Sequence, residues 1–137
     1  MYNIKEINQI WGKENHDNLM IEFWEFISET LAKEGFTDAL RKSEIPLNLP
    51  TNTHHEVVDA LNTYINETGL INTHVGLTSS DVVDNVRIYQ CQASINVIGD
   101  LLKKLNNDGL MPLIGQHGKV DCAGYTHWQI ASTTTLG

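Results

Sequence analysis

The chain has 137 residues, with 9 Lys or Arg against 17 Asp or Glu and a formal net charge of -8 at pH 7. This acidic balance excludes a general electrostatic attraction to nucleic acid or to an anionic membrane, so an anionic ligand needs a local positive site. No apolar run reaches the roughly 20 residues of a membrane span, and the first residues lack the pattern of a signal peptide, so we expect a cytoplasmic protein.

Two amphipathic helices are predicted in the first half of the chain. One extends from Gly12 to Lys33 and is stopped by Gly35, and the other begins near Thr53 and ends at Gly69. Their apolar stripes consist of Leu19, Phe23, Ile27 and Leu31 in the first helix and Val57, Leu61 and Ile65 in the second. We assign the aromatic cluster Phe23, Trp24 and Phe26 to core packing.

A third and longer helix is predicted from Thr78 to Gly109, with a length of about 40 Å at ~1.5 Å per residue. One face is apolar throughout, through Val82, Val86, Tyr89, Ala93, Val97, Leu101 and Leu105. Leaving such a row in water is unfavourable, so we expect a homo-oligomer. An irregular stretch, 115–125, should follow, in which Val120–Ala123 is a candidate extended segment, and then another helix start near Thr126. No sheet is predicted, which makes the predicted fold all-α.

The three later helix starts share a capping-box pattern, in which a threonine precedes an acid or amide by three positions. The pairs are Thr53 with Glu56, Thr78 with Asp81, and Thr126 with Gln129. Histidines lie in two of these first turns, where free N–H groups favour anions and lower a histidine pKa. Each capping box is equally consistent with a purely structural helix cap that has no role in binding.

Cys91 and Cys122 are expected to be reduced thiols, and no Cys/His spacing predicts a metal site.

Three segments resemble motifs of adenylosuccinate lyases, members of the fumarase/aspartase superfamily. NTHVGLTSSDVVDN at 72–85 resembles the family pattern H-x-G-x-T-S-x-D-x-x-D, and GYTHWQIASTTTLG at 124–137 resembles G-x-T-H-x-Q-x-A-x-x-T-T-x-G. THHEVVDAL at 53–61 resembles the helix opening T-R-H-D-V-V. The order and spacing of the three segments also agree with the family.

The resemblance implies a long-helix bundle that assembles as a tetramer, with active sites built from several subunits. It implies an amino-terminal helical domain at 1–77 and the start of the central bundle at 78–137. The implied reaction is a β-elimination without a cofactor. It releases fumarate from adenylosuccinate, giving AMP, and from the succinyl-carboxamide ribotide of purine biosynthesis. A base removes a proton next to a carboxylate, donors hold the resulting carbanion, and an acid protonates the departing nitrogen.

Residue roles follow from the same resemblance. His127 matches the proposed general acid, and His55 matches the second active-site histidine. The resemblance places substrate contacts at Tyr2, Glu56, Thr78, Ser79, Thr126 and Gln129, and at His54, which stands where the family has Arg. His74 is implied less directly, as a residue that shapes its loop.

Three departures from the family pattern affect the expected activity. Met1 stands where many relatives have Arg before Tyr2, and His54 replaces the Arg of T-R-H-D. Because imidazole does not replace the bidentate guanidinium, we expect weaker or altered binding of the nucleotide. The sequence ends at Gly137, before the serine loop that carries the family's proposed base. Two hypotheses remain: a lyase completed by a carboxy-terminal part, or a lyase-like binding module that joins a full-length enzyme or another partner without turnover.

Overall fold

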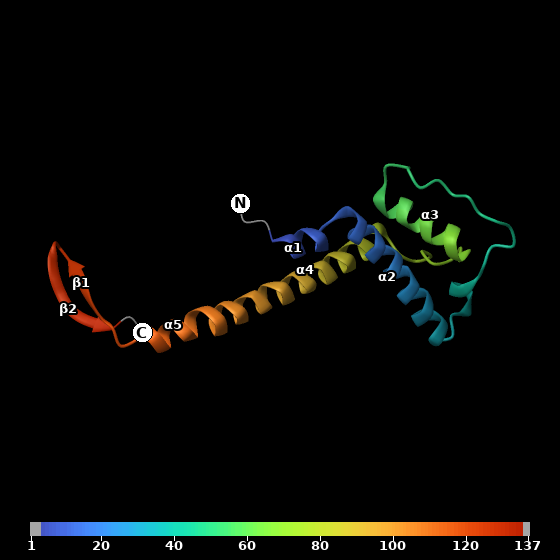
Figure 1. Ribbon diagram of the computed structural model, residues 1–137. Coiled ribbons are helices and arrows are strands. Elements are labelled where there is room, and N and C mark those ends of the chain that lie inside the picture. Colours follow the sequence, from blue (N-terminus) through green and yellow to red (C-terminus); the bar gives the residue numbers. More distant parts are fainter. Residues whose placement is uncertain (1–3, 136–137) are drawn as a thin grey trace. The chain divides into compact units, whose positions relative to one another are not determined.

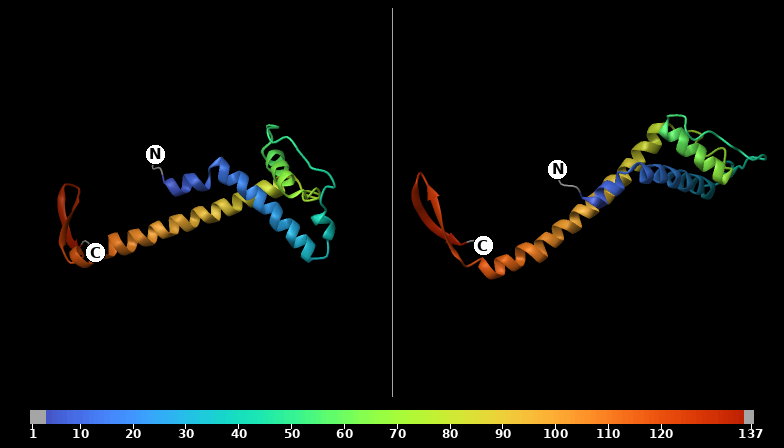
Figure 2. Two further views of the ribbon diagram at one scale, coloured as in Figure 1. Left: turned by 45° about the vertical axis from the view of Figure 1, so that its right-hand side comes forward. Right: turned by 45° about the horizontal axis from the view of Figure 1, so that its top comes forward.

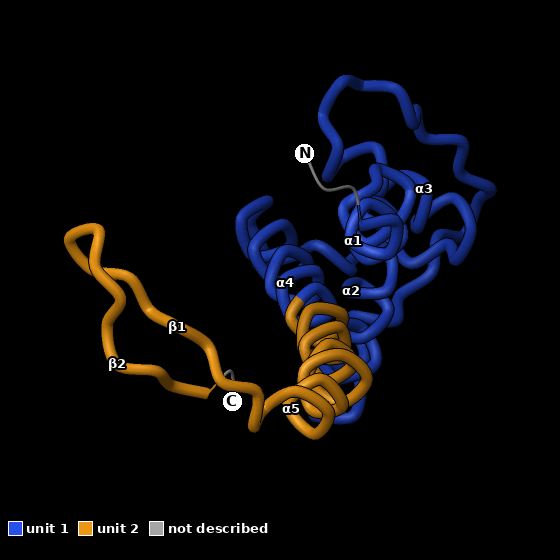
Figure 3. The backbone as a smooth tube through the Cα atoms, turned by 60° about the vertical axis from the view of Figure 1, so that its left-hand side comes forward, with its two compact units in different colours: residues 1–94 blue, residues 95–137 orange. Residues whose placement is uncertain are grey.

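The computed structural model describes residues 4–135, which divide into two compact units with the boundary between Ser94 and Ile95 (Figure 3). The elements in chain order are α1 (Lys5–Ile10), α2 (Lys13–Lys33), the 3-10 helix η1 (Thr37–Leu40), α3 (Glu56–Thr68), α4 (Ser79–Lys104), the π-helical segment η2 (Leu105–Leu110), α5 (Met111–His117), β1 (Asp121–Thr126) and β2 (Gln129–Thr135). Figure 1 labels the α-helices and the strands.

The helix predicted from Gly12 to Lys33 is confirmed as α2, with Gly12 as its extended N-cap. Gly35 follows with a φ of 93°, a left-handed conformation that favours glycine. The short α1 that precedes it was not predicted, because six residues are too few to show a helical period.

The buried face of α2 lies one residue away from the predicted stripe. Met20, Trp24 and Ser28 are its buried residues, whereas Leu19 and Phe23 pack at the margin of the core. The assignment to core packing is therefore confirmed for Trp24 and partly for Phe23. Phe26 is exposed, and its assignment was wrong. Sequence spacing fixes the helical period, but the neighbouring helix decides which of two adjacent stripes becomes the centre.

The second predicted helix is confirmed as α3, which begins at Glu56, three residues later than predicted, and ends at Gly69 with a φ of 77°. Helices α2 and α3 pack side by side in the views of Figure 2. Together with α4 they enclose one hydrophobic core, whose buried members are Met20, Trp24, Val57, Ala60, Tyr64, Leu70, Val82, Val83 and Val86.

A buried amide joins the first helices to α4. Gln90 is almost fully buried, and its Nε2 donates to the carbonyl of Ile10 at 2.8 Å. Its Oε1 accepts from His16 Nδ1 at 3.1 Å. Trp11 Nε1 donates to Ser94 Oγ at 2.9 Å one turn further along α4. These bonds satisfy polar groups that would otherwise be unfavourable to bury.

In the second unit the helical run continues past Gly109, where we predicted its end. The segment η2 includes Gly109, and α5 follows directly with Pro112 in its first turn. Proline cannot donate to the preceding turn and crowds it, and a π-helical segment just before Pro112 relieves that conflict. Glycine is a common helix end because it adopts the left-handed conformation easily, but Gly109 has no positive φ and the helical run passes through it.

The all-α prediction was wrong for the last described residues, which form an antiparallel hairpin of β1 and β2. The predicted helix start at Thr126 is instead the end of β1, where Thr126 pairs with Gln129 across a two-residue turn. Ile130 and the run Thr133–Thr135 are β-branched and favour a strand. Strand register shifts between Ala123 and Tyr125, around Gly124.

Candidate active site

The first predicted helix start, before α3, is organised differently from a Thr53–Glu56 capping box. The cap is His55, whose Nδ1 accepts from Val58 N at 3.4 Å. Thr53 instead donates twice to Asp59 Oδ1, from its backbone N at 2.7 Å and from its hydroxyl at 2.6 Å. That capping-box prediction was therefore wrong.

Backbone conformation explains the change. His54 has a φ of 65°, in the left-handed region, which turns the chain between Thr53 and the helix. This region is uncommon for residues other than glycine, although histidine tolerates it better than most. Because of this bend, Thr53 contacts Asp59 in the first helical turns of α3. His54, His55 and Glu56 are exposed to solvent.

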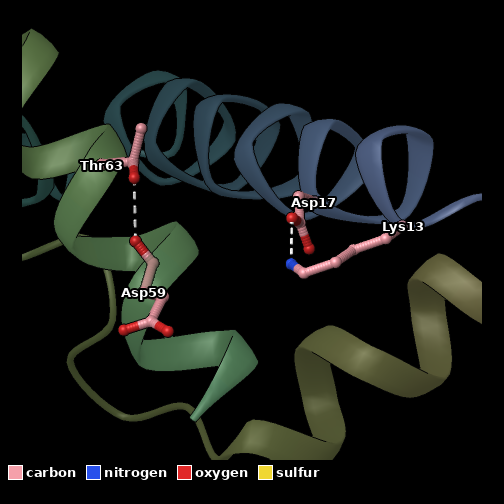
Figure 4. Close-up of polar contacts among 4 residues, drawn as sticks. All are labelled: Lys13, Asp17, Asp59 and Thr63. Atoms are coloured by element: carbon pink, nitrogen blue, oxygen red, sulfur yellow. Dashed lines mark hydrogen bonds and ion pairs between the residues drawn. The ribbon is translucent and has the colours of Figure 1, made fainter. Parts of the chain in front are cut away.

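The charges at this helix start include both signs. Hydrogen bonds from Thr53 hold the pKa of the Asp59 carboxyl below its ordinary value, and the positive charges of His54 and Lys13 act in the same direction. The pKa of Lys13 is raised, chiefly by its hydrogen bond to Asp17. Figure 4 shows the Lys13–Asp17 pair on α2 and Asp59 on α3. The first turn of α3 is thus an acidic helix start with a cation close enough to affect it.

The second helix start, before α4, retains half of the predicted capping box. Thr78 N donates to Asp81 Oδ2 at 2.7 Å, so the acid three positions later does reach back to the cap. Ser79 is the first residue of α4 and is partly buried, whereas Thr78 is exposed. Gly76 precedes them with a φ of 82°, which explains why the H-x-G motif carries a glycine there.

His74, four residues before Thr78, is held against the core of the first unit. Its Nδ1 accepts from Trp24 Nε1 at 3.2 Å, and the two rings meet edge to face with centroids 5.8 Å apart. Burial lowers the pKa of His74, while the negative charge of Asp81 acts in the opposite direction. The accepting role of Nδ1 and the lowered pKa both favour the neutral imidazole of His74.

The third group of predicted site residues lies in the hairpin. His127 and Trp128 form its turn with φ values of 47° and 64°. Thr126 Oγ1 lies 3.1 Å from His127 Nδ1, and Thr126, His127 and Gln129 are all exposed. Thr126 and Gln129 therefore flank the histidine as predicted by the motif, but from two paired strands.

The structure thus brings the site residues together in two groups. In the first unit, Val57 of α3 and Val82 of α4 belong to one core, so the first turns that carry His55 and Ser79 are anchored in the same cluster. The hairpin residues belong to the second unit, and a common cleft with His55 stays a prediction. Tyr2 lies outside the described residues. Within residues 4–135, no group of three or more His, Cys, Asp and Glu side chains is arranged to hold a metal ion.

Sequence reasoning missed two residues that shape these helix starts. Asp59 fixes Thr53, and Trp24 fixes His74. The apolar period of a helix predicts neither contact. The Thr53–Asp59 contact depends on the left-handed turn at His54, and the Trp24–His74 contact joins residues that are 50 apart in the chain.

Comparison with curated proteins supports the motif resemblance over the full chain. The sequence is 24% identical over 147 residues to an adenylosuccinate lyase of Archaeoglobus fulgidus, with 99% of this chain covered. It is 28% and 27% identical, over 152 residues each, to adenylosuccinate lyases of Methanocaldococcus jannaschii and Pyrococcus abyssi. The chain is a distant homologue of the adenylosuccinate lyases.

The matched region is only part of those enzymes. The chain spans about a third, 33%, of the length of each of these adenylosuccinate lyases. No protein-family model and no solved structure matches the sequence. In the part of the chain that the structure describes, no helix is long and apolar enough to cross a membrane.

Proposed function

We propose that this chain supplies part of the active site of an adenylosuccinate lyase-type enzyme of the cytoplasm. The reaction is the β-elimination that releases fumarate from adenylosuccinate, giving AMP, and from the succinyl-carboxamide ribotide of purine biosynthesis. The whole-chain similarity to adenylosuccinate lyases carries this proposal. The Thr78–Asp81 hydrogen bond supports it, because that bond fixes the helix start within the most specific of the three motifs.

In this proposal the two histidine groups have separate tasks. His127 is the general acid that protonates the departing nitrogen, with Thr126 and Gln129 beside it. His55 supports the acid and the substrate. Thr78 and Ser79 contact the substrate, and Thr126 and Gln129 orient the acid or bind the carboxylate, where donors stabilise the developing charge. Tyr2, His54 and Glu56 line the nucleotide site.

The exposure of the hairpin turn supports a site that is completed by further chain segments. His127 is exposed, and Thr126 is the side chain within hydrogen-bonding distance of its ring. A general acid works best in a site from which water is excluded and where neighbouring groups orient it. We therefore propose that other copies of the chain, or a carboxy-terminal part of the enzyme, cover the hairpin segment and complete the site.

Exposed apolar residues of the second unit support a second candidate, a binding module without turnover. In α4, Ile95, Ile98 and Leu102 are exposed, and Leu105 of η2 continues the row. Their spacing of three and four residues matches the a and d positions of a coiled coil. Such a row fits a helical partner, either another copy of this chain or a full-length lyase.

A complementation assay distinguishes the two candidates. The chain is co-expressed with a fragment of the Methanocaldococcus jannaschii adenylosuccinate lyase that lacks the region matched here, and the purified mixture is assayed for loss of adenylosuccinate and formation of fumarate. The lyase proposal expects turnover that falls by roughly 10²- to 10⁴-fold in His127→Ala. His117→Ala is the matched control, because His117 is an exposed histidine of α5 outside the motifs.

The remaining outcomes are informative as well. A stable complex without turnover overturns the lyase proposal and supports the binding module. Turnover that is unaffected by His127→Ala would remove the assigned acid. Absence of both complex and turnover contradicts both candidates.

A further inference from the structure

We propose that Trp24 is a positioning residue that commits His74 to its Nε2–H tautomer, so that His74 serves as a hydrogen-bond donor beside the start of α4. The tautomer follows from geometry alone, whereas its use in binding rests on the proposed lyase function.

The donor and acceptor roles are fixed by chemistry. An indole Nε1 carries a hydrogen and can only donate, so His74 Nδ1, 3.2 Å away, must accept through its lone pair. A neutral imidazole has one N–H, which is then on Nε2. Protonation of Nδ1 would place two N–H groups against each other and break this bond.

Both partners are held in place by their surroundings. Trp24 is fully buried, and its ring lies 6.4 Å from that of Tyr64. The preceding Thr73 is also buried, and its hydroxyl donates to the carbonyl of Leu70 at 3.2 Å. On the other side, Leu77 N donates to the carbonyl of His74 at 3.2 Å. The core therefore holds the indole of Trp24, and these bonds hold the backbone on both sides of His74.

The orientation has a chemical consequence for the proposed site. The charged group that acts on His74 is Asp81, whose carboxylate accepts the Thr78 N–H. His74 therefore adds an Nε2–H donor near a helix start that already has free N–H groups. Such a donor suits an acceptor oxygen of a carboxylate or phosphate. It also leaves Nδ1 occupied, so that this nitrogen does not act as a base.

Nuclear magnetic resonance of the ¹⁵N-labelled full chain tests the inference directly. We expect a nitrogen–nitrogen coupling across the hydrogen bond between Trp24 Nε1 and His74 Nδ1, and long-range proton–nitrogen spectra that show Nε2 protonated. A protonated Nδ1 at neutral pH, or the absence of the coupling, overturns the proposal.

Two variants add a second measurement. Trp24→Phe retains an aromatic ring but removes the donor, and should shift His74 toward a mixture of tautomers. Trp11→Phe is the matched control, because Trp11 donates to Ser94 instead, and should leave the His74 spectrum unchanged. An unchanged tautomer in folded Trp24→Phe contradicts the inference, and if that variant does not fold, the coupling in the wild type decides.

A titration with AMP separates this inference from the proposed function. Perturbation of the His74 Nε2–H signal by AMP supports the role in binding. Failure of AMP to affect any signal counts against the proposed binding role, while the tautomer measured in the free chain still decides the role of Trp24.

Discussion

A single carboxylate oxygen, Asp59 Oδ1, accepts both the backbone N–H and the hydroxyl of Thr53, at 2.7 and 2.6 Å. This pair ties the end of the long loop after η1 to the first half of α3. The same contacts lower the pKa of Asp59.

Asp59→Ala should therefore lower the free energy of unfolding at pH 7. Because the folded pKa of Asp59 lies below the unfolded value of 3.8, the stabilisation is present above about pH 3.8 and is lost as the pH falls through the folded pKa. Urea unfolding at several pH values should show a difference from wild type that shrinks on acidification.

Asp84→Ala is the control for this experiment. Asp84 forms an exposed pair with Arg87 at 3.6 Å, which contributes little to stability. An equal loss in both variants would show that general surface charge, rather than the bond to Thr53, is responsible.

Gly76→Ala should destabilise the first unit by about 1–2 kcal/mol, because an L-residue is strained in the left-handed region. No atom lies within 4 Å of a Cβ added at Gly76, so backbone strain rather than a clash would be the cause. Gly99→Ala is the opposite control. Gly99 lies within α4 with equal free space, and alanine there should stabilise by about 0.5–1 kcal/mol. A neutral Gly76→Ala would contradict the strain argument.

Mild acid should destabilise the chain through His74. Its folded pKa lies below the ordinary value of 6.5 because of burial, despite the opposing charge of Asp81. The unfolded chain therefore binds the proton first, so the stability is complete above about pH 6.5 and falls between 6.5 and the folded pKa. His74→Gln should flatten this part of the pH profile in urea unfolding. His117→Gln, at an exposed position, should retain the wild-type slope.

The sequence was informative where one local rule decided the structure. Helices α2 and α3 follow from their apolar period, and Gly35 and Gly69 end them with positive φ values. The bond between Thr78 and Asp81 was predictable because both residues belong to one helix start.

The prediction from sequence was wrong where one residue spacing is compatible with two local structures. Thr126 and Gln129 are three residues apart, which fits a capping box and equally the two residues that flank a two-residue hairpin turn. The β-branched residues that follow decide for the hairpin. The contact between Trp24 and His74 could not be predicted, because it depends on how α2 meets a distant loop.

The hairpin turn should become more stable in the double variant His127→Asn, Trp128→Gly. Both turn residues have positive φ, as in the turns that favour Asn-Gly. We expect a gain of roughly 1 kcal/mol for closing the hairpin, because asparagine and glycine adopt this conformation with less strain. Hydrogen exchange of the amides of β1 and β2 should slow accordingly. Unchanged exchange would contradict the turn assignment.

The last prediction concerns the exposed a and d row of Ile95, Ile98, Leu102 and Leu105. Full burial of such a side chain is favourable by about 1.5–3 kcal/mol relative to its exposure to water. The exposed row therefore favours self-association of the chain. Leu102→Glu should weaken the proposed oligomer, as measured by sedimentation equilibrium of the full chain. Lys103→Glu is the control, because Lys103 is exposed and pairs with Asp100 of the same helix. If both variants associate like the wild type, or if the wild type is monomeric at high micromolar concentration, the row is not a contact between copies. A full-length lyase would then be the partner to test. The exposed apolar row would still fit an apolar helix of that partner.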